Sequence, residues 1–240
     1  MSDRTKVTGA VAVEQIVDFA RARRASESRD GGIGSRFWPE SRKGMPKQFI
    51  DILGTGESLL AETYRRFLRF IPEENSLIIA NVEYVQPVRD HIPGIKSDCI
   101  LAEPQARNTA PCIAYASFVI QARNPDAVCV VAPSDHLITN EAEFQATIEK
   151  SFDFANHFDC LITLGIKPSR PDTGYGYIQM SPISGDEGFH EVKTFTEKPT
   201  AEIAKTFVES GEFLWNAGIF CWNVNAILER FEKYLPEIYS

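Results

Sequence analysis

Short, almost continuously apolar runs alternate with segments of helical periodicity along the middle of the chain, and this alternation constrains the fold most. The apolar runs cover residues 76–80, 98–102, 127–131 and 160–164. The helical segments cover residues 58–70, 109–123 and 141–157. Strands without polar alternation are typical of sheets that are covered on both faces. The pattern therefore predicts an α/β fold with a mostly parallel sheet and helices on both faces.

The two ends of the chain depart from this alternation. Turn formers are frequent over residues 168–176, and further strands are expected over 177–180 and 191–196. Residues 11–22 have an apolar helical face, whereas residues 23–30 are strongly polar. We therefore expect a helix but no buried strand in this atypical N-terminal segment, 1–30. Because no internal repeat or low-complexity linker follows it, we expect one domain over 31–240.

The composition is that of a globular protein and excludes several classes. Hydrophobic residues make up 43% of the chain, charged residues 24%, and the net charge is −8, which argues against a nucleic-acid surface. No apolar run approaches the ~18 residues of a membrane span. Five cysteines, an odd number without a C-x-x-C pair, argue against a disulfide framework or zinc site. A cytoplasmic protein is the simplest interpretation.

The segment from residue 31 to residue 47, GGIGSRFWPESRKGMPK, carries the most specific chemistry. Its glycines allow backbone amides to approach a polyphosphate closely, and its basic side chains can neutralise phosphates and a leaving pyrophosphate. The expected nucleotide-binding residues are Gly31, Gly32, Gly34 and Ser35, and the expected catalytic ones here are Arg36 and Lys47. An isolated GG-x-G would favour an ordinary Gly-rich turn. Here the Arg, Trp-Pro and Pro-Lys-Gln residues that follow favour a functional, phosphate-binding segment instead.

This segment resembles the signature of sugar-nucleotide pyrophosphorylases, and its GSRFWPESR and PKQF parts are similar to those of mannose-1-phosphate guanylyltransferases. Further motifs follow in the order of that family: EPQARNTAP at 103–111, PSDH at 133–136, TGYGYI at 173–178, FTEKP at 195–199 and WNAGIF at 215–220. The resemblance implies a Rossmann-like mixed sheet of the nucleotide-diphospho-sugar transferase type.

The resemblance also implies the reaction. GMP would pass from GTP to mannose 1-phosphate, giving GDP-mannose and pyrophosphate, with Mg²⁺ as cofactor. Relatives often associate, so a homo-oligomer is expected, without a nucleic-acid or membrane partner. A non-catalytic nucleotide-sugar-binding or regulatory homologue is the alternative, as is a pyrophosphorylase for another base or sugar. A dinucleotide-dependent oxidoreductase is weaker, because Phe37 occupies the place of the third glycine of that motif.

Asp135 follows a buried strand, and open α/β sheets bind their ligands at the carboxyl ends of strands. A carboxylate there can hold Mg²⁺ against the α-phosphate. The structural alternative is that Asp135 caps the next helix. His136 is interpreted as a hydrogen-bonded neighbour rather than a ligand.

The other candidate residues lie in two further regions. The segment that joins a strand to the helix at 109 offers free amides and polar side chains to a base or ribose. The expected nucleotide-binding residues there are Glu103, Arg107, Asn108 and Thr109, although helix capping could explain the last two. The expected sugar-binding residues are Gly174, Tyr175, Gly176, Glu197 and Asn216, with Lys198 steering the sugar phosphate. Composition alone would make residues 197–199 a surface turn, and Trp215 and Phe220 are expected in the core.

Two departures from the family pattern predict a sheet that is incomplete at both ends. The family has an apolar strand directly before the glycine segment, and here that position holds the polar residues 23–30. The family also continues to a second metal-binding aspartate, and this chain ends before it, at Ser240. Residues 7–13 could replace the missing strand only through an awkward connection.

Overall fold

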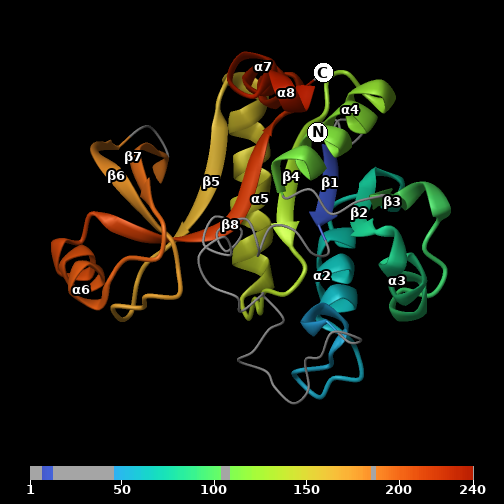
Figure 1. Cartoon of the computed structure of the whole chain (residues 1–240), viewed down its shortest axis with the longest axis horizontal. Helices are drawn as coiled ribbons and strands as arrows, with labels where there is room; N and C mark the ends of the chain where they lie inside the picture. The colour runs from blue at the N-terminus through green and yellow to red at the C-terminus, as the bar shows by residue number, and fades with distance from the viewer. Residues whose placement is uncertain (1–6, 13–45, 104–108, 185–187, 240) are drawn as a thin grey trace. The chain divides into compact units, whose positions relative to one another are not determined.

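The computed structural model describes residues 7–12, 46–103, 109–184 and 188–239. The chain divides into two compact units. The larger unit comprises Met1–Ile162 and Phe220–Ser240, and the smaller unit comprises Thr163–Ile219. Figure 1 shows the elements of both, and each unit has its own hydrophobic packing.

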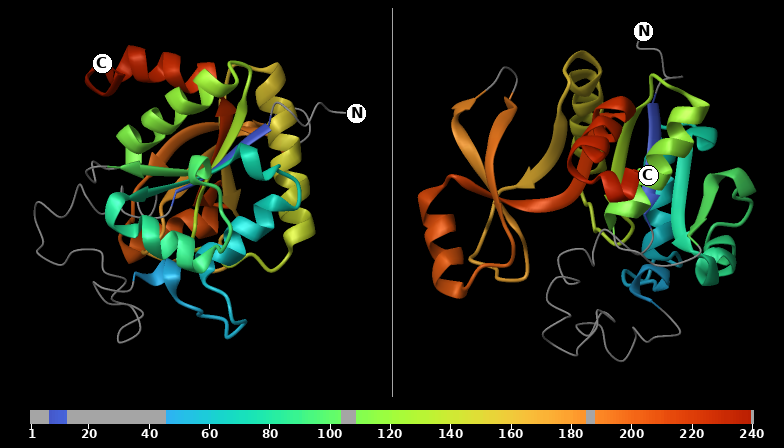
Figure 2. Two further views of the ribbon diagram at one scale, coloured as in Figure 1. Left: turned by 90° about the vertical axis from the view of Figure 1, so that its right-hand side faces the viewer. Right: turned by 45° about the horizontal axis from the view of Figure 1, so that its top comes forward.

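A mostly parallel sheet forms the centre of the larger unit. Its parallel strands lie in the order β3-β2-β1-β4. Their bounds are β1 (Val7–Ala12), β2 (Ser76–Asn81), β3 (Ile100–Glu103) and β4 (Val128–Pro133). The last residues of β8 (Phe213–Asn223) pair antiparallel with β4, so the sheet is mixed. The expected fold class is confirmed (Figures 1 and 2).

Strand β1 corrects the expectation that the sheet lacks its first strand, and it lies within residues 7–13, the alternative named for that position. Val7–Ala12 pairs with β2 on one side, where Ala10 lies opposite Leu77, and with β4 on the other, where Ala10 lies opposite Val131. A sheet without this strand would leave the facing backbone groups of β2 and β4 unpaired, which is costly in a protein interior. The helix expected over 11–22 is wrong at its first two residues, and its remainder lies outside the described residues.

Helices cover both faces of this sheet, which explains its almost continuously apolar strands. In β2, Leu77 and Ile79 belong to one core cluster, with residues of α4 (Thr109–Arg123) and α7 (Val224–Tyr234). Ile78 and Ala80 belong to another, with residues of α2 (Leu59–Leu68) and α3 (Val85–His91). Figure 2 shows α4 on one side of the strands and α2 on the other.

Capping side chains mark the starts of two helices. Ser58 Oγ accepts a hydrogen bond of 3.3 Å from Ala61 N at the start of α2. Asn140 Oδ1 accepts one of 3.2 Å from Glu143 N at the start of α5 (Glu141–His157). The bounds of α4 and α5 are those expected from the sequence. Further short elements are η3 (Lys47–Phe49), η4 (Glu73–Asn75), η5 (Val82–Tyr84), η6 (Ser97–Cys99) and α8 (Pro236–Tyr239).

The smaller unit is built on antiparallel strands. β6 (Tyr177–Ser184) pairs with β7 (His190–Thr196) and with the first residues of β8, so that Tyr177 lies opposite both Thr196 and Trp215. Tyr177 and Trp215 form a core with Ala204 of α6 (Ala201–Ser210). Strands expected over 177–180 and 191–196 are therefore confirmed.

Strand β5 (Leu161–Ile166) enters the smaller unit from the larger one and is less covered than expected. Leu161 is 45% exposed and Ile166 is 51% exposed. Among the described strands, β5 pairs with β8 alone, so it does not occupy a central position in a sheet. The expectation of a strand covered on both faces is wrong here.

The five cysteines are all free thiols. Cys99, Cys112, Cys129 and Cys221 are buried, and Cys160 is partly buried. Burial raises the pKa of Cys129 to about 12. All five thiols are described and free, as expected for a chain without a disulfide framework.

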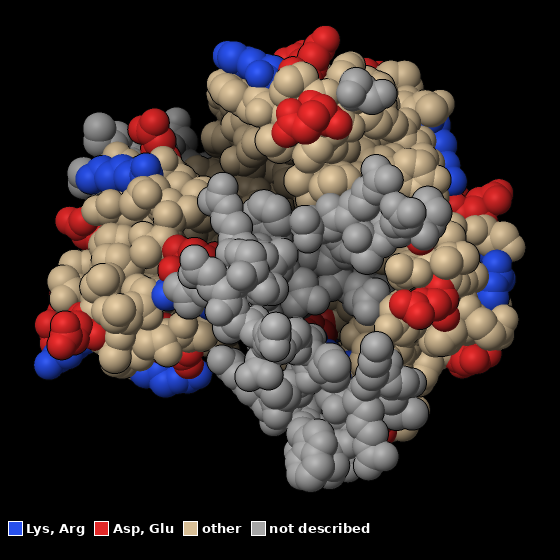
Figure 3. Space-filling view, viewed as in Figure 1, with Lys and Arg blue, Asp and Glu red and all other residues tan. Residues whose placement is uncertain are grey.

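No helix in the described ranges is long and apolar enough to span a membrane. On the face shown in Figure 3, basic and acidic side chains of the described residues are interspersed.

Candidate functional site

An ion pair joins two of the expected site residues in the larger unit. Lys47 begins η3, and Asp135 lies two residues after the end of β4. The ammonium of Lys47 pairs with Oδ2 of Asp135, and the side chains are 23% and 9% exposed. The structure thus brings together the last residue of the glycine-rich segment and the expected metal ligand.

The two carboxylate oxygens of Asp135 differ in their described partners. Oδ1 is buried and has no hydrogen-bond partner in the part of the chain that the structure describes. Leaving such an acceptor unpaired costs about 1–3 kcal/mol, which a bound cation would recover. Helix capping does not explain Asp135, because Asn140 caps α5.

Among the described residues, Asp135 belongs to no complete metal-binding cluster. Within the described ranges, no group of three or more His, Cys, Asp or Glu side chains could hold a metal ion. A hard cation that keeps waters and binds substrate phosphates needs only one or two protein carboxylates. The residues present therefore fit a divalent cation shared with a phosphorylated substrate.

His136 is held as a neutral imidazole. Burial lowers the pKa of His136, and the positive charges of Lys47 and Arg66 act in the same direction. The neighbouring carboxylate of Asp135 opposes this shift only in part. His136 therefore adds no positive charge at neutral pH.

Glu103 and Thr109 lie on either side of a segment outside the described residues. Glu103 ends β3 opposite Asn81 and is buried. Burial raises the pKa of Glu103, and a hydrogen bond with the thiol of Cys112 opposes this shift. Thr109 is the buried first residue of α4. Arg107 and Asn108 lie outside the described residues.

The described residues on either side of 13–45 lie at the carboxyl edge of the sheet. Ala12 ends β1 opposite Pro133, the last residue of β4. The described chain resumes just before Lys47, which contacts Asp135 at that edge. Gly31, Gly32, Gly34, Ser35 and Arg36 lie outside the described residues.

The smaller unit brings together three of the expected sugar-binding residues. Asn216 N donates a hydrogen bond of 2.8 Å to the carbonyl oxygen of Gly176. A Cβ atom at Gly176 would lie 3.4 Å from Oε2 of Glu197 and 3.7 Å from Cβ of Asn216. These are ordinary van der Waals distances, so the backbone of Gly176 lies directly beside the side chains of Glu197 and Asn216.

Lys198 lies beside this group in a strained backbone conformation. Its φ angle is 31°, the only positive value among the described non-glycine residues. Its Nζ lies 3.8 Å from Oε1 of Glu197. Such conformations persist where the surroundings fix them, and they occur often at ligand sites.

Asp172 and Arg170 are residues of this region that the sequence interpretation missed. Asp172 Oδ1 accepts a hydrogen bond of 2.8 Å from Gly174 N, and Oδ2 accepts one of 2.7 Å from Arg170 Nη2. The Arg170 guanidinium lies 5.5 Å from the centroid of the Trp215 ring. The ring of Tyr175 lies 5.0 Å from Trp215 as well. The Asp-x-Gly spacing, typical of an Asx-turn, was the available signal.

Residues 30–240 match the family model for nucleotidyl transferases. The chain belongs to the nucleotidyl transferase family. Its glycine-rich segment, Lys47, Asp135 and the residues around Gly176 all fall within the matched range.

Relatives of this nucleotidyl transferase include mannose-1-phosphate guanylyltransferase 2 of Escherichia coli O157:H7, 37% identical over 220 residues. The alignment covers 88% of this chain and 45% of that protein. Mannose-1-phosphate guanylyltransferase of Klebsiella pneumoniae is 36% identical over 212 residues, covering 87% and 44%. The chain thus spans less than half the length of these relatives. The expected family is confirmed.

A solved structure shares the fold of this nucleotidyl transferase. It is described as a mannose-1-phosphate geranyltransferase from Thermus thermophilus. The TM-score is 0.81 at 26% identity, over 98% of this chain and 62% of that one. Members of the family generally use a divalent metal ion.

Proposed function

We propose that the chain transfers GMP from GTP to mannose 1-phosphate, giving GDP-mannose and pyrophosphate. The observation that carries this proposal is the carboxylate of Asp135, with one oxygen on Lys47 and one buried oxygen without a described partner. The identity to mannose-1-phosphate guanylyltransferases supports the choice of base and sugar.

The reaction is an in-line displacement at the α-phosphorus. A phosphate oxygen of mannose 1-phosphate forms the new bond, and the bond to the departing pyrophosphate breaks. Because this oxygen is already ionised at neutral pH, no general base is needed, and a neutral His136 is compatible with that. Catalysis then depends on positioning and on neutralising charge at the phosphates.

Positive charge would come from the chain's own residues. Lys47 lies at the carboxyl edge of the sheet, and Arg36 and the amides of Gly31, Gly32 and Gly34 precede it in sequence. Glu103, Arg107, Asn108, Thr109 and Ser35 would bind the nucleotide. Mg²⁺ held by Asp135 would supply further charge neutralisation at the α-phosphate.

The sugar phosphate would bind to residues of the smaller unit. Glu197 and Asn216 offer an acceptor and an amide to the hydroxyls of a hexose, beside the backbone of Gly176. Gly174 and Tyr175 belong to the turn that Asp172 holds. Lys198 would bind the 1-phosphate and orient the nucleophilic oxygen.

The test is pyrophosphate release from GTP and mannose 1-phosphate, with and without Mg²⁺. Turnover is expected only with both substrates and the metal, and Asp135→Asn is expected to lower kcat by about a hundredfold. Asp153→Asn, on α5 with a side chain that is 80% exposed, is the matched control and should leave kcat unchanged.

Other outcomes would replace the proposal. Nucleotide binding without any turnover would mean a non-catalytic nucleotide-sugar-binding homologue. Turnover with UTP or dTTP but not with GTP would keep the reaction class and overturn the base. A panel of sugar 1-phosphates would decide the sugar in the same way.

A further inference from the structure

Helix α2 carries polar side chains where the sheet and α5 cover it. Thr63 and Arg66 are only 2% and 4% exposed, and neighbouring Glu62 is also buried. Buried polar groups are costly unless they are hydrogen-bonded. The partners of Thr63 and Arg66 therefore show what these two side chains stabilise.

The hydroxyl of Thr63 binds the backbone just before Asp135. Thr63 Oγ1 donates a buried hydrogen bond of 3.2 Å to the carbonyl oxygen of Ser134. Arg66 Nη1 donates one of 3.5 Å to the same hydroxyl oxygen. The start of the loop that carries Asp135 is thus fixed to α2 by a side chain distant in sequence.

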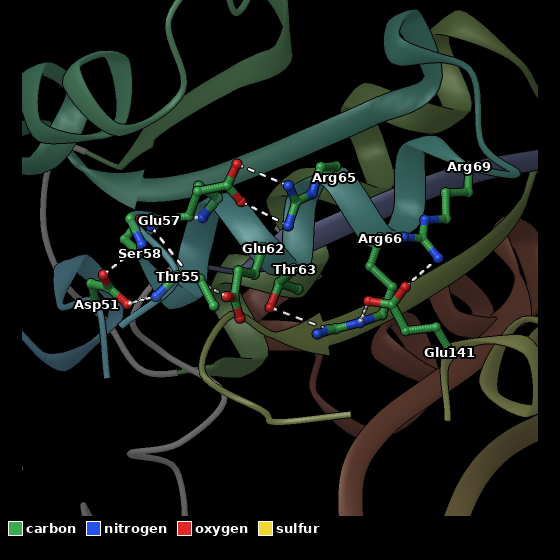
Figure 4. Close-up of polar contacts among 12 residues, drawn as sticks. Asp51, Thr55, Glu57, Ser58, Glu62, Thr63, Arg65, Arg66, Arg69 and Glu141 are labelled. Atoms are coloured by element: carbon green, nitrogen blue, oxygen red, sulfur yellow. Dashed lines mark hydrogen bonds and ion pairs between the residues drawn. The ribbon is translucent and has the colours of Figure 1, made fainter. Parts of the chain in front are cut away.

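The other end of the same loop is also bound to α2. Arg66 Nε donates a hydrogen bond of 3.3 Å to Oε1 of Glu141, the first residue of α5. Arg69 forms an ion pair with Oε2 of Glu141. Figure 4 shows both arginines directed at this carboxylate, with Thr63 beside Arg66. One helix therefore holds residues 134–140 at both ends.

Helix α2 supports the partner of Asp135 as well. Leu59 N donates a hydrogen bond of 3.3 Å to the carbonyl oxygen of Ile50, just after η3. Phe49 of η3 packs in one core cluster with Leu60 and Tyr64 of α2. The segment that begins with Lys47 and the loop that carries Asp135 thus rest on the same helix.

We infer that Thr63 and Arg66 are positioning residues that hold the carboxylate of Asp135 beside Lys47, ready for the metal and the nucleotide phosphates. The chemical role of Asp135 in this inference rests on the proposed function. The placement of the loop does not, because it follows from contacts in the protein without ligands.

The variant Thr63→Val removes the hydroxyl and keeps the shape, and Thr63→Ser restores the hydroxyl. Ser151→Ala is the control, because Ser151 is equally buried but donates within α5, to the carbonyl oxygen of Thr147. The first measurement is amide hydrogen exchange of peptides covering residues 134–140 in the ligand-free protein. Exchange is expected to be several times faster in Thr63→Val only.

The second measurement is the Mg²⁺ concentration that gives half-maximal turnover. It is expected to rise about tenfold in Thr63→Val, as when a residue that orients a metal ligand is lost. The KM for mannose 1-phosphate should stay unchanged, and Thr63→Ser should behave as the original chain. If the loss of any buried hydroxyl caused the change, Ser151→Ala would raise the Mg²⁺ concentration for half-maximal turnover as well.

The outcomes separate the two proposals. Unchanged exchange in Thr63→Val overturns the positioning role, whether or not the chain is active. Absent turnover in the original chain overturns the proposed function, while the exchange measurement still decides the placement of the loop. Should Thr63→Val not fold, Glu141→Gln weakens the other end of the loop and is judged by the same exchange criterion.

Discussion

Lys47 and Asp135 form an ion pair at the carboxyl edge of the sheet although one begins a short 3-10 helix and the other follows a central strand. Both charges are largely withdrawn from water, so each depends on the other for stabilisation. The pair is also where the glycine-rich segment meets the expected metal ligand.

Removing one charge of this pair should cost more stability than removing both. Lys47→Met leaves the Asp135 carboxylate without its counter-ion, whereas Lys47→Met with Asp135→Asn leaves no unpaired charge. Urea unfolding of the single and double variants should give a coupling free energy of about 1 kcal/mol. Additive effects would mean that the ion pair does not stabilise the folded chain.

The turn around Gly174 should depend on Asp172. Asp172→Ala removes the acceptor for Gly174 N and for Arg170, so the KM for mannose 1-phosphate should rise about tenfold, with the KM for GTP unchanged. Asp159→Ala is the control, because it breaks a similar two-pronged contact with Arg230. Equal effects of the two variants would contradict a specific role for Asp172.

Acid should destabilise the chain through His136. Burial lowers the pKa of His136 in the folded chain, and in the unfolded chain the pKa lies near the ordinary value of 6.5. As the pH falls below 6.5, the unfolded chain takes up a proton that the folded chain does not, and the free energy of unfolding decreases. The stability that the neutral His136 contributes is fully present above pH 6.5. It is lost as the pH falls toward the lower pKa that His136 has in the folded chain.

Denaturant unfolding between pH 7.5 and 5.5 measures this effect. His136→Asn should lose less stability over this range than the original chain does. Exposed His157 on α5 offers the control, His157→Asn. Parallel pH profiles for the original chain and His136→Asn would contradict the prediction.

Close packing in the smaller unit should make Gly165 sensitive to any side chain. A Cβ atom at Gly165 would lie 2.8 Å from Cβ of Leu214, well inside van der Waals contact. Gly165→Ala should therefore destabilise the chain by about 1–3 kcal/mol, measured as a lower Tm. Cδ1 of Leu214 would lie nearer still. Leu214→Ala in the same chain removes Cδ1 and keeps Cβ, so it should recover part of the loss, and no recovery would show that the contact with Cβ accounts for the destabilisation.

Local signals were sufficient for most elements of the fold. Helical periodicity predicts α4 and α5 at their observed bounds, and Ser58 marks the start of α2. Strand β1 could not be predicted in the same way. Whether Val7–Ala12 pairs depends on the backbone groups of β2 and β4, which are distant in sequence.

The sequence predicts individual candidate residues of the site but not the contacts between them. Lys47 and Asp135 follow from motif and strand position, and the structure adds their ion pair. The buried partners Thr63 and Arg66 were not predicted, because polar residues in an amphipathic helix ordinarily face water. Arg36 and the glycines before it remain predictions.

The buried thiols can report the local opening of the structure. A neutral, buried thiol does not react with an alkylating reagent until the surrounding structure opens. Cys112 and Cys129 lie in the core around the central strands, whereas Cys160 is partly accessible. The rate at which each cysteine is alkylated, read by mass spectrometry, would therefore time the opening of separate parts of the molecule without any introduced label.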